Sequence, residues 1–389
     1  GGNYNVVVGD EAGTAITTGD NNVAVGYASL DVLTTGSTNT GLGSMSLGSN
    51  TTAGNNVGVG YYALKANTTG DNNVAVGTNA LDAATTASNN TAVGSDALTA
   101  NTTGTENVAV GAGALTANTT GSYNHAFGRN AGAAITTGAT NIAIGNAALS
   151  TATTADGNTA IGHNTLAANT SGASNVAVGA NALDANTSAS NNTAVGYAAL
   201  TANTTGTENV AFGQVALTQS TTGNYNTGLG RAALYGNTTA SNNTAVGYNS
   251  LLSNTTGADN VAVGALSLDA NTTASNNTAV GYASLGANST GYDNTAVGKS
   301  ALAANTTAPN NTAVGISSLT ANTTGASNSA LGVNSLITNT TGSNNVAIGQ
   351  QALNYNTTAA NNTAVGFQSL MANTTGASNV AVGTSALTA

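Results

Sequence analysis

The chain has 389 residues and a net charge of −10, with 14 acidic and 4 basic residues and no Cys. So few basic residues exclude a nucleic-acid partner, which needs cations to bind its phosphates. The lack of Cys excludes disulfides and thiolate metal sites, and no apolar run is long enough to form a membrane-spanning helix.

A 17-residue repeat runs from Asn5 to Asn379 in 23 copies without insertion or deletion. It is too short for a helical pair of about 33 residues or a propeller blade of about 40, but it fits one turn of a β-solenoid. We therefore predict an all-β fold, a parallel β-solenoid (β-roll) with 23 coils. At about 4.8 Å per coil, residues 1–389 would form a single continuous rod roughly 110 Å long.

Each coil, numbered from its first Asn, reads Asn-(Val/Thr)-Ala-Val-Gly-x-x-(Ala/Ser)-Leu-x-Ala-Asn-Thr-Thr-(Gly/Ala)-x-x. Position 1 is Asn in every coil, and stacking would let each amide hydrogen-bond to the next. Position 5 is Gly in every coil, which predicts a corner with positive φ or close backbone approach. The predicted ladder includes Asn22, Asn73, Asn107, Asn192, Asn260 and Asn345, and the corners include Gly26, Gly77, Gly111, Gly196, Gly264 and Gly349.

Positions 2 to 4 form the predicted strand, with positions 2 and 4 on one face and position 3 on the other. Position 4 is always Val, Ile, Leu or Phe, whereas position 3 is Ala or Gly in every coil except the first, which has Val7. Position 9 is Leu in 21 coils and Gly13 or Gly132 in the others. The position-4 apolar column includes Val25, Val76, Val110, Val195, Val263 and Ile348.

Two arrangements fit this periodicity. If the small residues lie inside a thin coil, the position-4 column points outward and exceeds the apolar area that a soluble monomer exposes, which predicts self-association. If Val and Leu both face inward, a single chain can stand alone. The last coil stops at position 11 and residue 1 enters at position 14; uncapped ends of this kind would allow head-to-tail filaments.

The segments Asn89–Gly94 (NNTAVG) and Thr140–Gly145 (TNIAIG) resemble the NSVAIG motif of trimeric autotransporter adhesin heads. The segments Ala12–Gly19 and Ala131–Gly138 are similar to repeats of bacteriophage tail fibres. The adhesin resemblance implies a left-handed, trimeric parallel β-roll with its Val/Ile face toward the trimer axis. Within residues 1–389 we expect no coiled-coil stalk or membrane-anchor barrel like those of the adhesins, and no terminal chaperone domain like that of many tail fibres.

Catalytic and metal-binding residues are scarce. His125 and His163 occupy different positions of separate coils, and the carboxylates are scattered, with Asp31, Asp82, Asp184 and Asp269 at position 10. We expect no catalytic site, no cofactor and no metal site. The carboxylates would keep the rod soluble and limit lateral aggregation.

Asn and Thr near the end of each coil offer two further functions. Thr-Thr at positions 13 and 14 suggests ice binding as a function, because regular Thr arrays can match ordered water. Adjacent residues point to opposite faces, however, so one Thr column at most would be exposed. Position 12 forms an Asn-x-Ser/Thr acceptor in 16 coils, among them Asn50, Asn67, Asn118, Asn203, Asn254 and Asn373. We favour turn chemistry over glycosylation for these residues, because glycans at coil spacing would crowd.

The sequence thus predicts a non-enzymatic, extracellular or cell-surface fibre, the head or shaft of a surface adhesin or filament. The alternatives are a phage tail-fibre shaft and an ice-binding or receptor-binding solenoid. The expected partner is the chain itself, as a homotrimer or a head-to-tail filament, with a host or surface receptor as a further option. Tyrosines at position 6 form a candidate contact column (Tyr27, Tyr61, Tyr197, Tyr248 and Tyr282), although a solvated strand edge explains them equally well.

Overall fold

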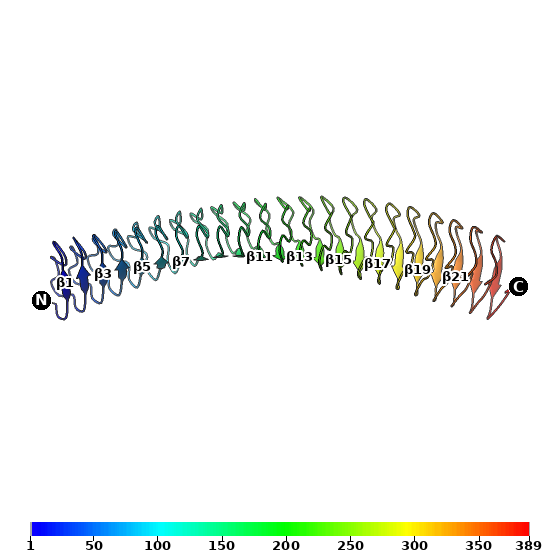
Figure 1. Ribbon diagram of the computed structural model, residues 1–389, viewed down its shortest axis with the longest axis horizontal. Coiled ribbons are helices and arrows are strands. Elements are labelled where there is room, and N and C mark those ends of the chain that lie inside the picture. Colours follow the sequence, from blue (N-terminus) through cyan, green and yellow to red (C-terminus); the bar gives the residue numbers. More distant parts are fainter. Residues whose placement is uncertain (1, 389) are drawn as a thin grey trace. The chain divides into compact units, whose positions relative to one another are not determined.

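A computed structural model describes residues 2–388 and confirms the predicted fold class. These residues form 23 parallel strands and no helix, so the fold is an all-β parallel solenoid (Figure 1). Each strand is three residues long and occupies positions 2 to 4 of its coil. Turns and bends make up the rest of the coil.

The chain divides into two compact units, Gly1–Asn192 and Thr193–Ala389, and each is described by itself. The prediction of a single continuous rod stays a prediction. The first unit contains β1 (Val6–Val8), β2 (Val23–Val25), β3 (Thr40–Leu42), β4 (Val57–Val59), β5 (Val74–Val76), β6 (Thr91–Val93), β7 (Val108–Val110), β8 (His125–Phe127), β9 (Ile142–Ile144), β10 (Thr159–Ile161) and β11 (Val176–Val178). The second contains β12 (Thr193–Val195), β13 (Val210–Phe212), β14 (Thr227–Leu229), β15 (Thr244–Val246), β16 (Val261–Val263), β17 (Thr278–Val280), β18 (Thr295–Val297), β19 (Thr312–Val314), β20 (Ser329–Leu331), β21 (Val346–Ile348), β22 (Thr363–Val365) and β23 (Val380–Val382).

Within each unit, successive strands pair in parallel and in chain order. The register is constant, because each residue lies beside the residue 17 positions later; Val74, for example, pairs with Thr91, and Ala75 with Ala92. Equivalent side chains therefore stack in columns, and the chemistry of one position is repeated along the whole unit.

The corner at position 5 requires glycine for two reasons. All 23 of these glycines have φ between 126° and 140°, a region that residues with a side chain rarely adopt. A Cβ added to Gly111 would also lie 2.5 Å from the carbonyl oxygen of Gly128 in the next coil. Any side chain here would push neighbouring coils apart and break the sheet that they share.

The interior contains the small residues and the leucines together. Ala75 at position 3 and Leu81 at position 9 are fully buried, and the same holds for the equivalent residues of most coils. Val74 and Val76, at positions 2 and 4, lie on the outer side and are half-buried. The small-inside arrangement is therefore the one that forms. The second arrangement is wrong in pairing Val with Leu, since Leu faces inward and Val outward.

Positions 7, 9 and 17 adopt the left-handed conformation, and in most coils a residue other than glycine occupies them, a feature that the sequence pattern did not reveal. Position 9 is the least expected of them, because a bulky buried residue such as Leu98 has φ of 53°. This conformation costs about 1–2 kcal/mol per residue, while burial of a Leu side chain stabilises by about 1.5–3 kcal/mol. The core contact thus offsets the backbone strain.

The two coils without Leu at position 9 compensate from position 12. Gly132 has φ of 60°, and a Cβ placed on it would lie 3.1 Å from Cδ1 of Ile135. Gly13 and Ile16 repeat this relationship, with the same 3.1 Å distance. In both coils Ile replaces the usual Asn at position 12 and fills the space of the missing Leu, so the volume of the core is conserved.

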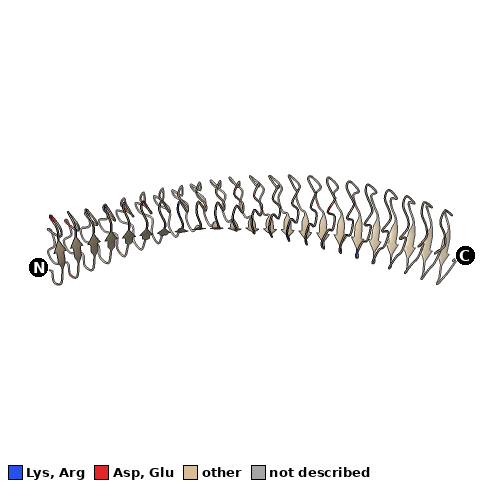
Figure 2. Ribbon diagram, in the orientation of Figure 1, with Lys and Arg blue, Asp and Glu red and all other residues tan. Residues whose placement is uncertain are grey.

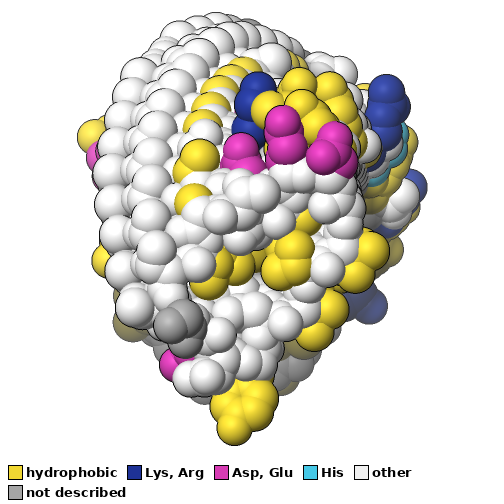
Figure 3. All heavy atoms as spheres, turned by 90° about the vertical axis from the view of Figure 1, so that its left-hand side faces the viewer, with side chains coloured by type: hydrophobic (Ala, Val, Ile, Leu, Met, Phe, Trp, Pro, Cys, Tyr) yellow, Lys and Arg dark blue, Asp and Glu magenta, His cyan; other side chains and the backbone are white. Residues whose placement is uncertain are grey.

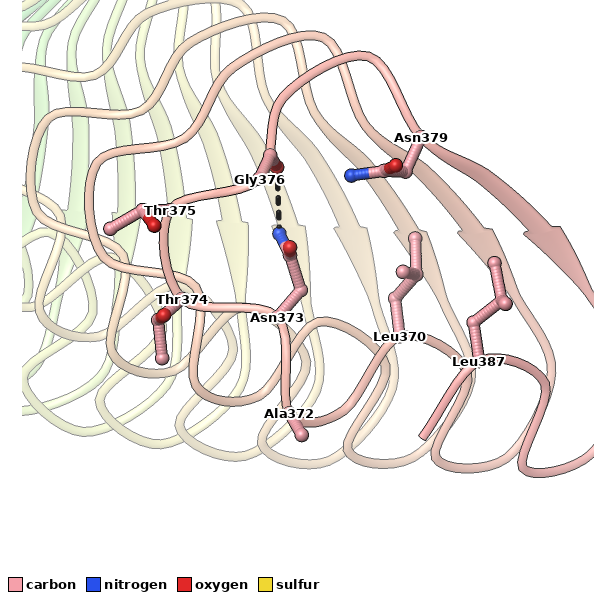
Figure 4. A pocket seen from close by; sticks show the side chains of 8 residues that line it. All are labelled: Leu370, Ala372, Asn373, Thr374, Thr375, Gly376, Asn379 and Leu387. Atoms are coloured by element: carbon pink, nitrogen blue, oxygen red, sulfur yellow. Dashed lines mark hydrogen bonds between the residues drawn. The ribbon is translucent and has the colours of Figure 1, made fainter. Parts of the chain in front are cut away.

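A pocket of about 320 Å³ lies at the last coils, and Figure 4 shows the side chains that line it. Leu370 and Leu387 occupy position 9 of successive coils, and the Asn373 amide donates to the Gly376 carbonyl at 2.9 Å. The pocket is lined by Leu370, Ala372, Asn373, Thr374, Thr375, Gly376, Asn379 and Leu387. In the earlier coils, the equivalent side chains and backbone groups are covered by the next coil.

Candidate interaction surface on the strand face

The outward side chains at positions 2 and 4 form a surface that we call the strand face. Position 4 is apolar in every coil and position 2 is Val, Ile, Thr or Ser in every coil but one, where His125 replaces it. Among the apolar residues, exposure is greatest in the first and last coils, where 58% of Val8 and 70% of Val382 is accessible. In the coils between them it is greatest at larger residues, with 53% of Phe212 and 49% of Leu331 accessible. The predicted members Val25, Val76, Val110, Val195 and Val263 are half-buried, and Ile348 is exposed.

Charged residues are sparse along the chain (Figure 2), yet they are sorted across the two edges of the strand face. Three of the four basic residues lie at position 6, just after the strand: Arg129, Arg231 and Lys299. Four acidic residues lie at position 17, before the Asn that opens the following coil: Glu106, Glu208, Asp259 and Asp293. All seven side chains are exposed. At position 6 the charged residues are therefore basic except for Asp10, although Glu11 and Asp96 lie beside this edge at position 7, and at position 17 they are all acidic.

Acidic residues of one edge and basic residues of the other also lie at similar positions along the stack of coils. Asp293 and Lys299 flank the same strand, β18. Glu208 precedes β13 and Arg231 follows β14, the next strand, while Glu106 precedes β7 and Arg129 follows β8. Each basic residue on one edge thus has an acidic counterpart on the other edge within one coil.

The tyrosines at position 6 belong to the basic edge. Tyr27, Tyr61, Tyr197, Tyr248 and Tyr282 are all about half exposed, between 49% and 56%. Tyr248 also lies under Arg231, whose guanidinium carbon is 5.5 Å from the ring centroid. The edge therefore combines aromatic and cationic side chains, a composition enriched at the centres of protein interfaces.

From Asn22 to Asn362, the asparagines at position 1 are buried and link neighbouring coils. Asn73 Oδ1 accepts from the backbone N–H of Asn90 at 3.0 Å and from Asn90 Nδ2 at 3.2 Å. Asn73 Nδ2 donates to the carbonyl of Ala87 in its own coil at 2.8 Å. Each side chain thus closes its own coil and holds the next one. Asn22, Asn107, Asn192, Asn260 and Asn345 are likewise fully buried.

A second asparagine ladder at position 12 was not recognised from the sequence. In the second unit this ladder is unbroken from Asn237 to Asn373. Each amide Nδ2 donates to the Oδ1 of the position-12 Asn in the preceding coil at 2.8–3.2 Å. Asn50, Asn67, Asn118, Asn203 and Asn254 are fully buried. The folded chain therefore does not present these acceptors for glycosylation. The signal available in the sequence was the recurrence of Asn at position 12 in 16 coils.

The two threonine columns differ in their hydrogen bonds. At position 13, the hydroxyl of Thr102 donates to the carbonyl of Thr119 in the next coil at 3.1 Å, and this bond recurs along both units. Position 14, represented by Thr103, is exposed. The outward hydroxyls thus form one column rather than the two-dimensional array that would favour ice binding.

The aspartates at position 10 are half-buried. Burial raises the pKa of the Asp82, Asp184 and Asp269 carboxyls above the usual range, and the same cause raises the pKa of Asp31. Acidic side chains gather beside hydrophobic ones at the β1 end (Figure 3). There a hydrogen bond to Glu11 raises the pKa of Tyr27.

Across residues 2–388, no three His, Asp or Glu side chains lie close enough together to hold a metal ion. His125 is on the strand face, whereas His163 follows β10 at position 6, so the two histidines occupy separate coils. The same residues include no helix with the length and apolar character needed to cross a membrane. Neither a scan against models of known protein families nor a search of curated proteins finds a match to the chain.

Proposed function

We propose that this chain is a non-enzymatic structural segment of an extracellular fibre, the head or shaft of a surface adhesin or filament. We further propose that copies of it associate through the strand face. The observation that carries the proposal is the outward, almost uncharged strand face, which no other part of the described chain covers. Apolar columns continued over many coils exceed what soluble monomers usually expose.

The interior supports a structural role. Its leucines pack against alanines, and its asparagines use their amides to bind the neighbouring coil. These side chains are committed to holding the coils together. The setting at a cell surface rests on the resemblance of the NNTAVG segments to adhesin heads.

The sorted edge charges favour one relative orientation of the copies. In a cyclic assembly with parallel axes, the end of each strand points toward the start of a strand in the neighbouring copy, so position 6 of one copy meets position 17 of the next. Lys299 of one copy would then face Asp293 of its neighbour at the same height. Exposed ion pairs contribute only about 0–1 kcal/mol each, so their effect would be to select register and orientation rather than to supply affinity.

The strand face is tested by sedimentation velocity with two lysine variants of one coil. Val263→Lys places a charge in the strand face, and Thr273→Lys places it at exposed position 14. We expect the unmodified chain and Thr273→Lys to sediment as the same oligomer and Val263→Lys to dissociate. A monomeric unmodified chain at all concentrations, or equal behaviour of the two variants, would contradict the proposal.

The orientation is tested by exchanging charges at β18. Asp293→Lys and Lys299→Glu should each weaken the assembly, because like charges would meet across the interface. The double variant restores opposite charges between copies and should recover the assembly. Failure of the double variant to recover, with the singles impaired, would exclude the parallel in-register arrangement.

A further inference from the structure

The position-12 ladder is interrupted in the first unit, at Ala84. In the preceding coil, which we call the coil below, Asn67 Oδ1 is fully buried and accepts no hydrogen bond from any described residue. In the following coil, the coil above, Asn101 Nδ2 donates one N–H to Gly104 at 3.0 Å. Ala84 itself is fully buried. A buried carbonyl without a donor costs about 1–3 kcal/mol, so this arrangement calls for a polar group between the two asparagines.

An intact part of the ladder shows which bonds the missing amide would make. Asn118 Nδ2 donates to Asn101 Oδ1 and to the Gly121 carbonyl, both at 3.0 Å. These two acceptors lie 2.5 Å and 2.3 Å from the point that a Cβ on Gly104 would occupy. In an unbroken stretch such as Asn288–Asn322, the amide oxygen also accepts from the asparagine above, at 3.0 Å.

The same acceptors are present and similarly placed at the interruption. Asn67 Oδ1 and the Ala87 carbonyl lie 2.6 Å and 2.0 Å from the point that a Cβ on Gly70 would occupy. The carbonyl of Ala87 already accepts from Asn73 at 2.8 Å, but at Ala84 there is no side-chain donor that could reach it from position 12. Two carbonyl oxygens therefore converge without the N–H groups that join them in other coils.

We infer that the space above Ala84 is a binding site for one water molecule that replaces the missing carboxamide. A water donates two hydrogen bonds, here to Asn67 Oδ1 and Ala87 O, and accepts one from the second N–H of Asn101 Nδ2. Replacing Asn by Ala removes a whole carboxamide, which leaves room for a molecule that needs about 10–15 Å³. Three polar partners are the usual number for a buried water.

Ala152, the other alanine in the ladder, provides an internal control. It lies above Ile135 rather than Asn, so no side-chain acceptor is available from the coil below. The space above Ala152 thus lacks one of the three partners, and the site for water is incomplete there. Asn118 Oδ1, below Ile135, also has no donor, but the Ile side chain occupies the space that a water would need.

The test is a crystal structure of the unmodified chain at a resolution that resolves ordered waters. We expect one water within about 2.7–3.2 Å of Asn67 Oδ1, Ala87 O and Asn101 Nδ2, and none at the corresponding place above Ala152. Empty density above Ala84, or an Asn67 side chain rotated to another partner, would overturn the inference.

A pair of variants gives an independent readout. Ala84→Asn should displace the water, complete the ladder from Asn67 to Asn118 and raise the unfolding temperature. Ala152→Asn gains fewer hydrogen bonds and should raise it less. A larger gain from Ala152→Asn would contradict the assignment of the partners.

Discussion

Asn254 Nδ2 lies 3.0 Å from Asn237 Oδ1 and donates to it, although both side chains are fully buried in the solenoid. The same amide also donates to Gly257 in its own coil at 2.9 Å. One side chain therefore fixes a turn within a coil and the distance to the neighbouring coil. This dual use explains how a sequence with so few large hydrophobic residues forms an ordered interior, and it leads to the first prediction.

Asn305→Leu should destabilise the coils around it by about 2–4 kcal/mol, because Asn288 Oδ1 loses its donor and Asn322 Nδ2 loses its acceptor. Leu is sterically acceptable here, since Leu33 occupies the same position beside Leu30. Hydrogen exchange of the backbone amides in these coils measures the loss locally, which suits a repeat protein. Thr307→Ala, at exposed position 14, is the control and should change protection by less than about 0.5 kcal/mol. Equal effects would refute the role of the ladder.

Gly264→Ala should cost about 3 kcal/mol or more. Gly264 has φ of 132°, and its added Cβ would lie 2.6 Å from the carbonyl oxygen of Gly281. Gly286→Ala is the matched control, because its nearest contact would be an ordinary 3.4 Å. Thermal unfolding of the two variants distinguishes the corner from other glycines. A Gly264→Ala protein that unfolds at the temperature of the unmodified chain would show that the corner tolerates a side chain.

Gly132 and Ile135 should be energetically coupled. Gly132→Leu alone drives a side chain against Leu115 and Ile135, and Ile135→Asn alone leaves a void beside Gly132. The double variant recreates the usual pair of Leu and Asn and supplies a donor for Asn118 Oδ1. A double-mutant cycle in denaturant should give a coupling of about 1–3 kcal/mol in favour of the double variant. Additive effects would mean that the two positions do not share a space.

The pH dependence of stability should be unusual, because burial raises the pKa of Asp269 and its equivalents. The folded chain holds these protons more tightly than the unfolded chain does. The free energy of unfolding should therefore fall as pH rises from the unfolded pKa through the folded pKa. Asp269→Asn should weaken this dependence and raise the unfolding temperature at neutral pH, while Thr273→Ala should leave the profile unchanged. A profile of Asp269→Asn identical to that of the unmodified chain would contradict this account.

The fold could be predicted because the repeat has no insertions. A constant 17-residue spacing puts Val74 beside Thr91 and every later pair in the same register, so length and phase alone define the solenoid. The corner glycines were also predictable, since a residue with φ near 130° must be Gly wherever the corner recurs. In such a chain the same repeat determines both the local backbone conformation and the pairing of strands between coils.

The direction of the side chains was harder to predict. Alternation separates position 3 from positions 2 and 4, but it does not say which side is inside, and Leu98 reaches the interior through a left-handed conformation that its residue type does not favour. The role of Asn118 was missed because Asn-Thr-Thr reads equally well as a turn or a glycosylation acceptor. Only the stacking of the coils shows that Asn118 is buried against Asn101.

The charged edges were missed for a different reason. Lys299 and Asp293 are each unremarkable as exposed residues at variable positions. Their arrangement is apparent only when all coils are aligned on the strand face, where the basic and acidic residues lie on opposite sides.

The central claim, that copies associate through the strand face, is tested most directly by cysteine crosslinking, since the chain has no Cys of its own. Val263→Cys and Thr273→Cys place one thiol on the strand face or at exposed position 14 of the same coil. Under mild oxidation, we predict that Val263→Cys forms disulfide-linked dimers at low protein concentration and that Thr273→Cys does not. Crosslinking of Thr273→Cys alone, or of neither variant, would contradict the account.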